Sequence, residues 1–170
     1  WNGLGVPTGA IRGYAAGFGA TGIVPKPGAR AIAQTSTGNL AVLINPHPLQ
    51  RSTIEILPPG GGVAAVVTVG INAVEMVAGH DETLWTLNRV SGTISRIQYG
   101  NVQTIVPTTS NAALDCLVLL ANGGVLVTFQ GQVVAAVFDA SGNSELPVAL
   151  PEPVIRAVAD GDTSAFMLGQ

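Results

Sequence analysis

The fold of this chain is decided by the stretch Glu75-Met-Val-Ala-Gly-His-Asp-Glu-Thr-Leu-Trp-Thr-Leu87. Two short apolar runs flank a polar turn, which is the pattern of a β-hairpin. The same pattern returns at 31–43, 116–128 and 157–168. Equivalent positions lie 44, 41 and 41 residues apart, counted through Leu40, Leu84, Val125 and Phe166. A period of about 40–45 residues built from short strands is typical of β-propeller blades.

A second hairpin pattern follows each of the first three copies. It is found at 52–67, 92–107 and 132–147, and the copy missing after Gln170 stands at the start of the chain as 10–25. The steps within this set are 43, 40 and 39 residues, counted through Ile11, Ile54, Ile94 and Val133. The first residues therefore supply what the last repeat lacks.

We predict an all-β chain that folds as a small β-propeller of about four blades, with one blade shared between the N- and C-termini. The repeats cover about 29–70, 71–111, 112–153, and 154–170 plus 1–28 of a single domain. Two alternatives stay open. The hairpins fit a β-sandwich or jelly roll nearly as well, and the split blade can be completed by a neighbouring molecule instead of the same chain.

The phrases at 77–87 and 158–168 resemble repeats of the regulator-of-chromosome-condensation type and tectonin-type lectin repeats. The resemblance covers nearly the whole chain through short phrases. It implies a propeller architecture and transfers no functional residue to this sequence.

The composition excludes several classes of function. Charged residues make up 10% of the chain and the net charge is −3, with Lys26 as the single lysine. No basic stripe is present to neutralise phosphates, so we expect no nucleic-acid partner. No apolar run reaches the roughly 18 residues of a membrane helix, so we expect no membrane insertion. Since the chain begins with Trp1, we expect a processed or trimmed product.

Polar and aromatic residues at the turns are the candidate binding residues. Asp81 and Asp162 occupy the same turn in different repeats and should face one end of the ring. Trp1 and Trp85 are aromatic residues able to stack on sugars, although the strand position of Trp85 beside Leu84 and Leu87 favours packing within a blade. The cluster at 80–82 and the acidic loop at 139–145 are interpreted as solvated turns, because neither has the ligand spacing of a metal site. We expect no catalytic residue, no metal and no cofactor.

These observations favour a non-enzymatic structural or interaction protein that presents loops on a propeller. The charge-poor composition predicts an apolar surface that packs against protein partners, either further copies or other subunits, in an extracellular or virion-type assembly. A lectin-like module that binds carbohydrate is the alternative. An enzyme with its site at the propeller axis is the second alternative.

Overall fold

The computed structural model describes residues 10–14, 20–59, 62–79, 81–160 and 164–169, and for 10–14, 20–25, 155–160 and 164–169 it describes the backbone alone. Within these ranges the chain forms sixteen strands in five antiparallel sheets and no helix. No helix able to cross a membrane is found in this part of the chain.

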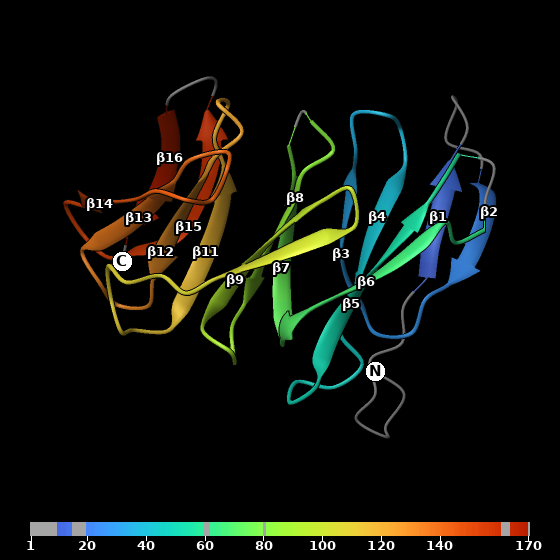
Figure 1. Ribbon diagram of the computed structural model, residues 1–170, viewed down its shortest axis with the longest axis horizontal. Helices are drawn as coiled ribbons and strands as arrows, with labels where there is room; N and C mark the ends of the chain where they lie inside the picture. Colours follow the sequence, from blue (N-terminus) through green and yellow to red (C-terminus); the bar gives the residue numbers. More distant parts are fainter. Residues whose placement is uncertain (1–9, 15–19, 60–61, 80, 161–163, 170) are drawn as a thin grey trace.

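Three of the sheets have four strands each, in chain order, and a two-stranded hairpin lies at each end (Figure 1). The first hairpin is β1 (Ala10–Tyr14) and β2 (Ala20–Pro25). The first full sheet is β3 (Ala29–Gln34), β4 (Leu40–Ile44), β5 (Arg51–Leu57) and β6 (Ala65–Ile71). The second is β7 (Ala73–Ala78), β8 (Leu84–Asn88), β9 (Thr93–Gln98) and β10 (Asn101–Ile105). The third is β11 (Leu114–Leu119), β12 (Val125–Phe129), β13 (Val134–Phe138) and β14 (Glu145–Ala149), and the last hairpin is β15 (Val154–Asp160) and β16 (Ser164–Gly169).

The first strand of each full sheet lies on the inner side of the arc. Strand β7 contacts both β3 and β11, and β11 in turn contacts β15. The fourth strands are outermost, as in the blades of a propeller. Each sheet therefore runs from the axis outward, and we call the three full sheets blades 1, 2 and 3.

Neighbouring blades bury apolar side chains between their faces. Blades 1 and 2 share one core cluster, in which Leu43 and Ile54 face Met76. Blades 2 and 3 share a second cluster around Trp85 and Phe129. A twisted sheet with two apolar faces is stable only when both are covered, which is why stacking drives this fold.

Polar side chains also link blade 2 to blade 3. The Glu75 carboxylate on β7 accepts a hydrogen bond from the backbone N–H of Leu117 at 2.7 Å. On the outer side, Arg96 donates to the carbonyl oxygen of Ala140 at 2.6 Å, and its guanidinium carbon lies 5.8 Å from the centre of the Trp85 ring. These contacts fix the position of blade 2 relative to blade 3 both at the inner strands and farther out from the axis.

The strand pairing confirms Leu40, Leu84 and Val125 as equivalent positions, because each pairs with the residue six positions before it. In the last hairpin this relation holds for Ala165, so Phe166 is one residue beyond the equivalent position.

One member of the second set is corrected as well. Leu87 pairs with Ile94, and its equivalent Thr128 pairs with Ala135. Ala135 therefore stands where the spacing placed Val133. The β8–β9 and β12–β13 turns both contain four residues, so the second set keeps the same step of 41 residues between blades 2 and 3 as the first set, and Val133 lies two residues before the equivalent position.

The predicted all-β propeller architecture is confirmed, but the two ends of the chain do not meet in one blade. Strands β1–β2 and β15–β16 are separate two-stranded sheets at opposite ends of the molecule (Figure 1). Repeat spacing identifies equivalent strands, but it does not set the angle between blades. A closed ring of four blades needs about 90° between neighbours, whereas larger propellers need less. Small residues such as Ala31, Ala33 and Ala41 let blades 1 and 2 stack closely.

Candidate functional site

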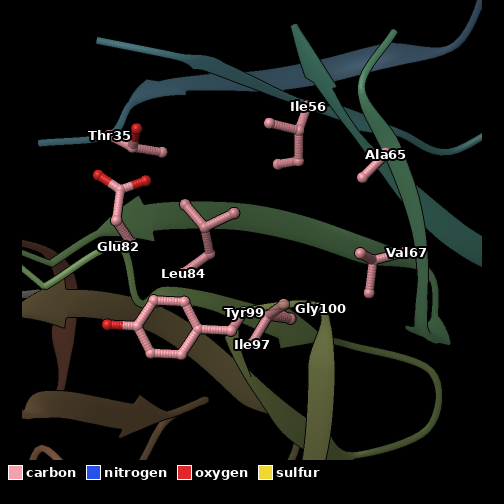
Figure 2. A pocket seen from close by; sticks show the side chains of 9 residues that line it. All are labelled: Thr35, Ile56, Ala65, Val67, Glu82, Leu84, Ile97, Tyr99 and Gly100. Atoms are coloured by element: carbon pink, nitrogen blue, oxygen red, sulfur yellow. The ribbon is translucent and has the colours of Figure 1, made fainter. Parts of the chain in front are cut away.

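The candidate site is an open pocket between blades 1 and 2 (Figure 2), which we call the inter-blade pocket. Its walls are apolar side chains that point into the space between the two sheets. Its mouth is formed by Thr35, Glu82, Tyr99 and Gly100, and its walls by Ile56, Ala65, Val67, Leu84 and Ile97.

Tyr99 and Gly100 form the two-residue turn between β9 and β10. Both have positive φ angles, 50° and 79°, and the flanking residues Gln98 and Asn101 pair with each other. This is the pattern of a type I′ hairpin turn, whose first central position favours Asn, Asp or Gly. A tyrosine there is strained, and its side chain is 80% exposed. The turn therefore displays a large aromatic ring beside an apolar pocket.

Glu82 lies at one end of the pocket, close to Thr35 (Figure 2). It too has a positive φ angle, 62°, in the turn between β7 and β8. One carboxylate oxygen accepts hydrogen bonds from the Ser36 hydroxyl and from the Thr37 backbone N–H, each 2.6 Å long. The Ser36 hydroxyl above all lowers the pKa of Glu82 below its ordinary value. Glu82 is therefore a fixed negative charge at neutral pH that joins the two blades.

Asp81 belongs to the same turn and connects it with the Tyr99 turn. Its carboxylate accepts a hydrogen bond of 3.0 Å from the side-chain amide of Gln98, next to Tyr99. The side-chain hydrogen bond with Thr83 is the main reason why the pKa of Asp81 is lowered. The opening is thus lined by one ionised carboxylate, that of Glu82, and one exposed phenol ring, and Asp81 connects their two turns through Gln98.

The size of the inter-blade pocket limits what it holds. Its volume is ≈ 200 Å³, whereas pockets for drug-sized ligands usually have about 300–1,000 Å³. A single large apolar side chain fits this space better than a whole cofactor. The lining contains one carboxylate, that of Glu82, and no basic residue.

The candidate residues from the sequence have different positions in the structure. Asp81 is not part of the pocket lining, and its carboxylate accepts a hydrogen bond from Gln98, next to Tyr99. Trp85 is fully buried in the cluster between blades 2 and 3, so the expectation that it stacks on a sugar is wrong. Its strand position beside Leu84 and Leu87 favours packing over exposure, as the sequence indicated. Asp162 and Trp1 lie outside the described residues, as does His80.

The acidic loop at 139–145 is closed by its own hydrogen bonds. The Asp139 carboxylate accepts from the Ser141 hydroxyl at 2.6 Å and from the Asn143 N–H at 3.2 Å. These bonds, that of Ser141 first, hold the pKa of Asp139 far below its ordinary value. The loop is therefore an Asx-type turn, as the sequence indicated. No group of three or more metal-ligating side chains occurs in the described ranges.

Sequence reasoning missed the roles of Glu82 and Tyr99. A hairpin signal was present for Tyr99, because an X-Gly dipeptide stands between the runs 93–98 and 101–105. No local signal existed for Glu82, since its partners Ser36 and Thr37 belong to the preceding repeat and approach only when the blades stack.

Comparisons with known proteins bear on the fold. No protein-family model matches the chain, and no curated protein matches its sequence significantly. Among solved structures, it is similar to virginiamycin B lyase from Staphylococcus aureus, with a TM-score of 0.74 at 12% identity over 94% of this chain and 56% of that one. A streptogramin B lyase gives a TM-score of 0.75 at 18% identity over 93% and 54%. These neighbours are β-propellers. This chain has the same fold.

A third similar structure is BBS1N in complex with ARL6DN, with a TM-score of 0.69 at 17% identity over 95% of this chain and 55% of that one. The chain thus spans about half the length of the structures that it matches. Since its sixteen strands cover 56% of the first neighbour, a ring of the same curvature would hold about 28 strands, or about seven blades. The finer resemblance to regulator-of-chromosome-condensation or tectonin repeats stays a prediction.

Proposed function

We propose that this chain is a non-enzymatic protein-interaction module, and that the inter-blade pocket binds a large apolar side chain of an extended peptide segment. The observation that carries the proposal is the exposed ring of Tyr99, held in a strained turn beside an apolar pocket. Backbone strain persists where the surrounding structure enforces it, and such residues cluster at binding sites.

The chemistry of the mouth indicates which peptide fits. An aliphatic side chain would contact Ile56, Leu84 and Ile97, while the Tyr99 ring would cover it from the solvent side. The carboxylates of Asp81 and Glu82 stay ionised at neutral pH and favour a Lys or Arg next to that side chain. We therefore expect recognition of a basic residue followed by a large apolar one.

The apolar contact should contribute more than the ion pair. Complete burial of a leucine side chain is worth about 1.5–3 kcal/mol, whereas an exposed ion pair contributes roughly 0.2–1 kcal/mol. Loss of the apolar residue should therefore weaken binding by about tenfold or more. Reversal of the neighbouring charge should weaken it several-fold.

Fluorescence polarisation with four labelled hexapeptides tests this proposal. The peptides are Gly-Gly-Xaa-Yaa-Gly-Gly, with Arg or Glu as Xaa and Leu or Ser as Yaa. We expect the Arg-Leu peptide to bind most tightly, Glu-Leu more weakly, and both Ser peptides weakest. Added salt should reduce the difference between Arg-Leu and Glu-Leu and leave that between Leu and Ser unchanged.

Two variants assign the binding to the pocket. Glu82→Gln should weaken Arg-Leu and leave Glu-Leu almost unchanged, and Tyr99→Asn should weaken both. Leu49→Asn is the matched control, because Leu49 is an exposed apolar residue in the β4–β5 connection, outside the pocket. Equal affinity for all four peptides, or binding that Tyr99→Asn leaves intact, would disprove the assignment.

The neighbour in complex with ARL6DN supports protein binding only at the level of the fold, since identity is 17%. Carbohydrate binding, the alternative function, is an outcome of the same experiment. Tyr99 is an exposed aromatic residue, and saturation by a monosaccharide with no response to the four peptides would favour the lectin-like alternative. An extracellular or virion-type setting remains a prediction from composition.

A further inference from the structure

A second hollow lies between blades 1 and 2, against the outer strands β6 and β10, and we call it the outer groove. Its volume is ≈ 430 Å³, within the range of about 300–1,000 Å³ that is usual for small-ligand pockets. It follows the second half of β6, whereas the inter-blade pocket uses Ala65 and Val67 in the first half. Its polar lining residues are Arg51, Thr68, Ser91, Thr93 and Thr104.

Arg51 supplies the charge of the outer groove. Among the described residues that line it, Arg51 carries the one positive charge and none is acidic. The side chain is exposed, and within the described ranges it has no hydrogen bond or ion pair. Its backbone is fixed, because Arg51 pairs with Ile71 and the adjacent Ser52 hydroxyl accepts a 3.0 Å hydrogen bond from the N–H of Ala73. The guanidinium group is therefore held at the groove and is available to an anion.

Buried polar side chains behind the groove orient one of its hydroxyl groups. Thr93 lines the groove and is only 8% exposed. Its hydroxyl oxygen accepts a 3.1 Å hydrogen bond from the side-chain amide of Asn88 and lies 2.9 Å from the hydroxyl oxygen of Ser91. The fully buried Asn88 also donates to Ser95 at 2.9 Å and accepts from Thr86 at 3.1 Å. The position of the Thr93 hydroxyl is therefore set from behind.

This network makes Ser91 a hydrogen-bond donor toward the groove. The buried hydroxyl hydrogen of Thr93 needs an acceptor, and since Asn88 donates to Thr93, that acceptor is the Ser91 oxygen. The same oxygen accepts from the backbone N–H of Ile71 at 3.2 Å. A serine hydroxyl has two acceptor lone pairs and one hydrogen, so both lone pairs are engaged and the hydrogen is left for a ligand. Ser91 and Arg51 together offer donors alone, which suits an oxyanion.

The rest of the lining indicates what the oxyanion is attached to. Thr68 and Thr104 are exposed, and their hydroxyl groups can donate to and accept from the hydroxyl groups of a ligand. Val69 and Val102 offer apolar contact to a carbon skeleton. A water molecule takes up about 30 Å³, so a bare acetate or phosphate ion would leave most of the groove to water. A larger ligand that carries both a carboxylate and hydroxyl groups fits better.

We propose that the outer groove binds a small polyhydroxylated carboxylate, a sugar acid, with Arg51 and Ser91 holding the carboxylate. The planar fork of a guanidinium group matches the two oxygens of a carboxylate. The hydroxyl groups of Thr68 and Thr104 contact those of the ligand. This proposal is independent of peptide binding, because the outer groove and the inter-blade pocket share no lining residue.

An amide NMR titration at constant ionic strength tests the site with two ligands that differ in the carboxylate, methyl glucuronide and methyl glucoside. We expect the glucuronide to shift the amide signals of Ile71 and Thr93 and to bind about tenfold or more tightly than the glucoside. Acetate should shift the same signals with lower affinity. Equal affinity for the glucoside, or tighter binding of inorganic phosphate, would overturn the carboxylate assignment. Acetate binding as tight as that of the glucuronide would overturn the role of the hydroxyl groups.

Substitutions assign the binding to the outer groove. Arg51→Gln should weaken glucuronide binding by about tenfold or more and leave glucoside binding unchanged. Arg51→Lys keeps the charge without the fork and should recover part of the affinity. Ser91→Ala should weaken glucuronide binding several-fold, since one donor is lost. Both positions are exposed, so circular dichroism should report folded variants.

Arg30→Gln is the matched control, because Arg30 is an exposed arginine on β3 outside the groove and its replacement removes the same charge. It should leave the affinity for the glucuronide unchanged. Glucuronide binding that survives Arg51→Gln, or that Arg30→Gln weakens equally, would overturn the proposal. So would a titration in which the Ile71 and Thr93 signals do not move.

Discussion

Replacement of Tyr99 by Asn separates stability from binding. Tyr99 occupies a left-handed backbone conformation with φ of 50°, which costs a residue with a side chain other than Asn, Asp or Gly about 1–2 kcal/mol. Asn tolerates this conformation at the first position of a type I′ turn. Since the Tyr99 side chain is 80% exposed, its removal loses little burial. We expect Tyr99→Asn to raise the free energy of unfolding by about 1 kcal/mol.

Urea unfolding followed by far-UV circular dichroism measures this change. The midpoint should rise while the m-value stays the same, because the folded surface hardly changes. The melting temperature should rise by roughly 2–4 °C for a chain of this size. The same variant should bind the Arg-Leu hexapeptide more weakly, since the aromatic cover of the pocket is gone. Gain of stability with loss of binding is the pattern expected of a strained functional residue.

Val90→Asn is the matched control for this experiment. Val90 is an exposed apolar residue in the turn between β8 and β9, and it does not have a positive φ angle. The control should therefore leave stability unchanged or lower it. If Tyr99→Asn destabilises the chain, or stabilises it no more than Val90→Asn does, then the strain assigned to the Tyr99 turn is not present.

Three further substitutions test the packing of the blades. Phe129→Ala removes a fully buried ring from the cluster between blades 2 and 3, and urea unfolding should show a loss of about 3–5 kcal/mol. Gly70→Ala would place a Cβ atom 2.6 Å from the side chain of Asn88, which must move, so we expect a loss of about 1–3 kcal/mol in the same assay. Glu145 accepts hydrogen bonds from the Thr109 hydroxyl at 2.6 Å and from the backbone N–H groups of 108–109 at 2.7–2.9 Å. Burial opposes the ionisation of Glu145, but these bonds, that of the Thr109 hydroxyl first, prevail and lower its pKa. A carboxylate whose pKa is lower in the folded state than in the unfolded state adds to the free energy of unfolding above its unfolded-state pKa. That contribution is lost as the pH falls through the folded-state pKa. Between pH 7 and pH 3, the free energy of unfolding of Glu145→Gln should therefore fall less than that of the wild type.

The sequence predicted the strands well because their signals are local. Alternating residues around 93–98 and polar turns such as 122–124 mark hairpins, and the repeat period aligns them into blades. Ring closure was predicted less well. The angle between blades depends on how the side chains of two stacked faces fill the space between them. Those side chains come from distant parts of the sequence, since Ala33 and Met76 pack in one cluster but are more than forty residues apart. A local pattern therefore does not predict the angle.

The site was harder to predict for the same reason. Asp81 was selected for its turn, and its carboxylate contacts Gln98, but the neighbouring Glu82 is the residue that lines the pocket and makes the contacts that join two blades. Trp85 was selected as an aromatic residue, yet its strand faces blade 3 and buries it. Exposure of an aromatic residue depends on which face its neighbours cover. Tyr99 remains exposed because it stands in a turn.

The first and last hairpins of one chain lie apart, at the two ends of an open arc. Spin labels at Arg12→Cys and Leu168→Cys in a single chain, diluted in excess unlabelled protein, test it by electron paramagnetic resonance. Dilution ensures that any dipolar contact between labels is within one molecule. The open arc predicts spectra without dipolar broadening. Strong broadening would show that the first and last hairpins share a blade in the same chain, and would contradict the account.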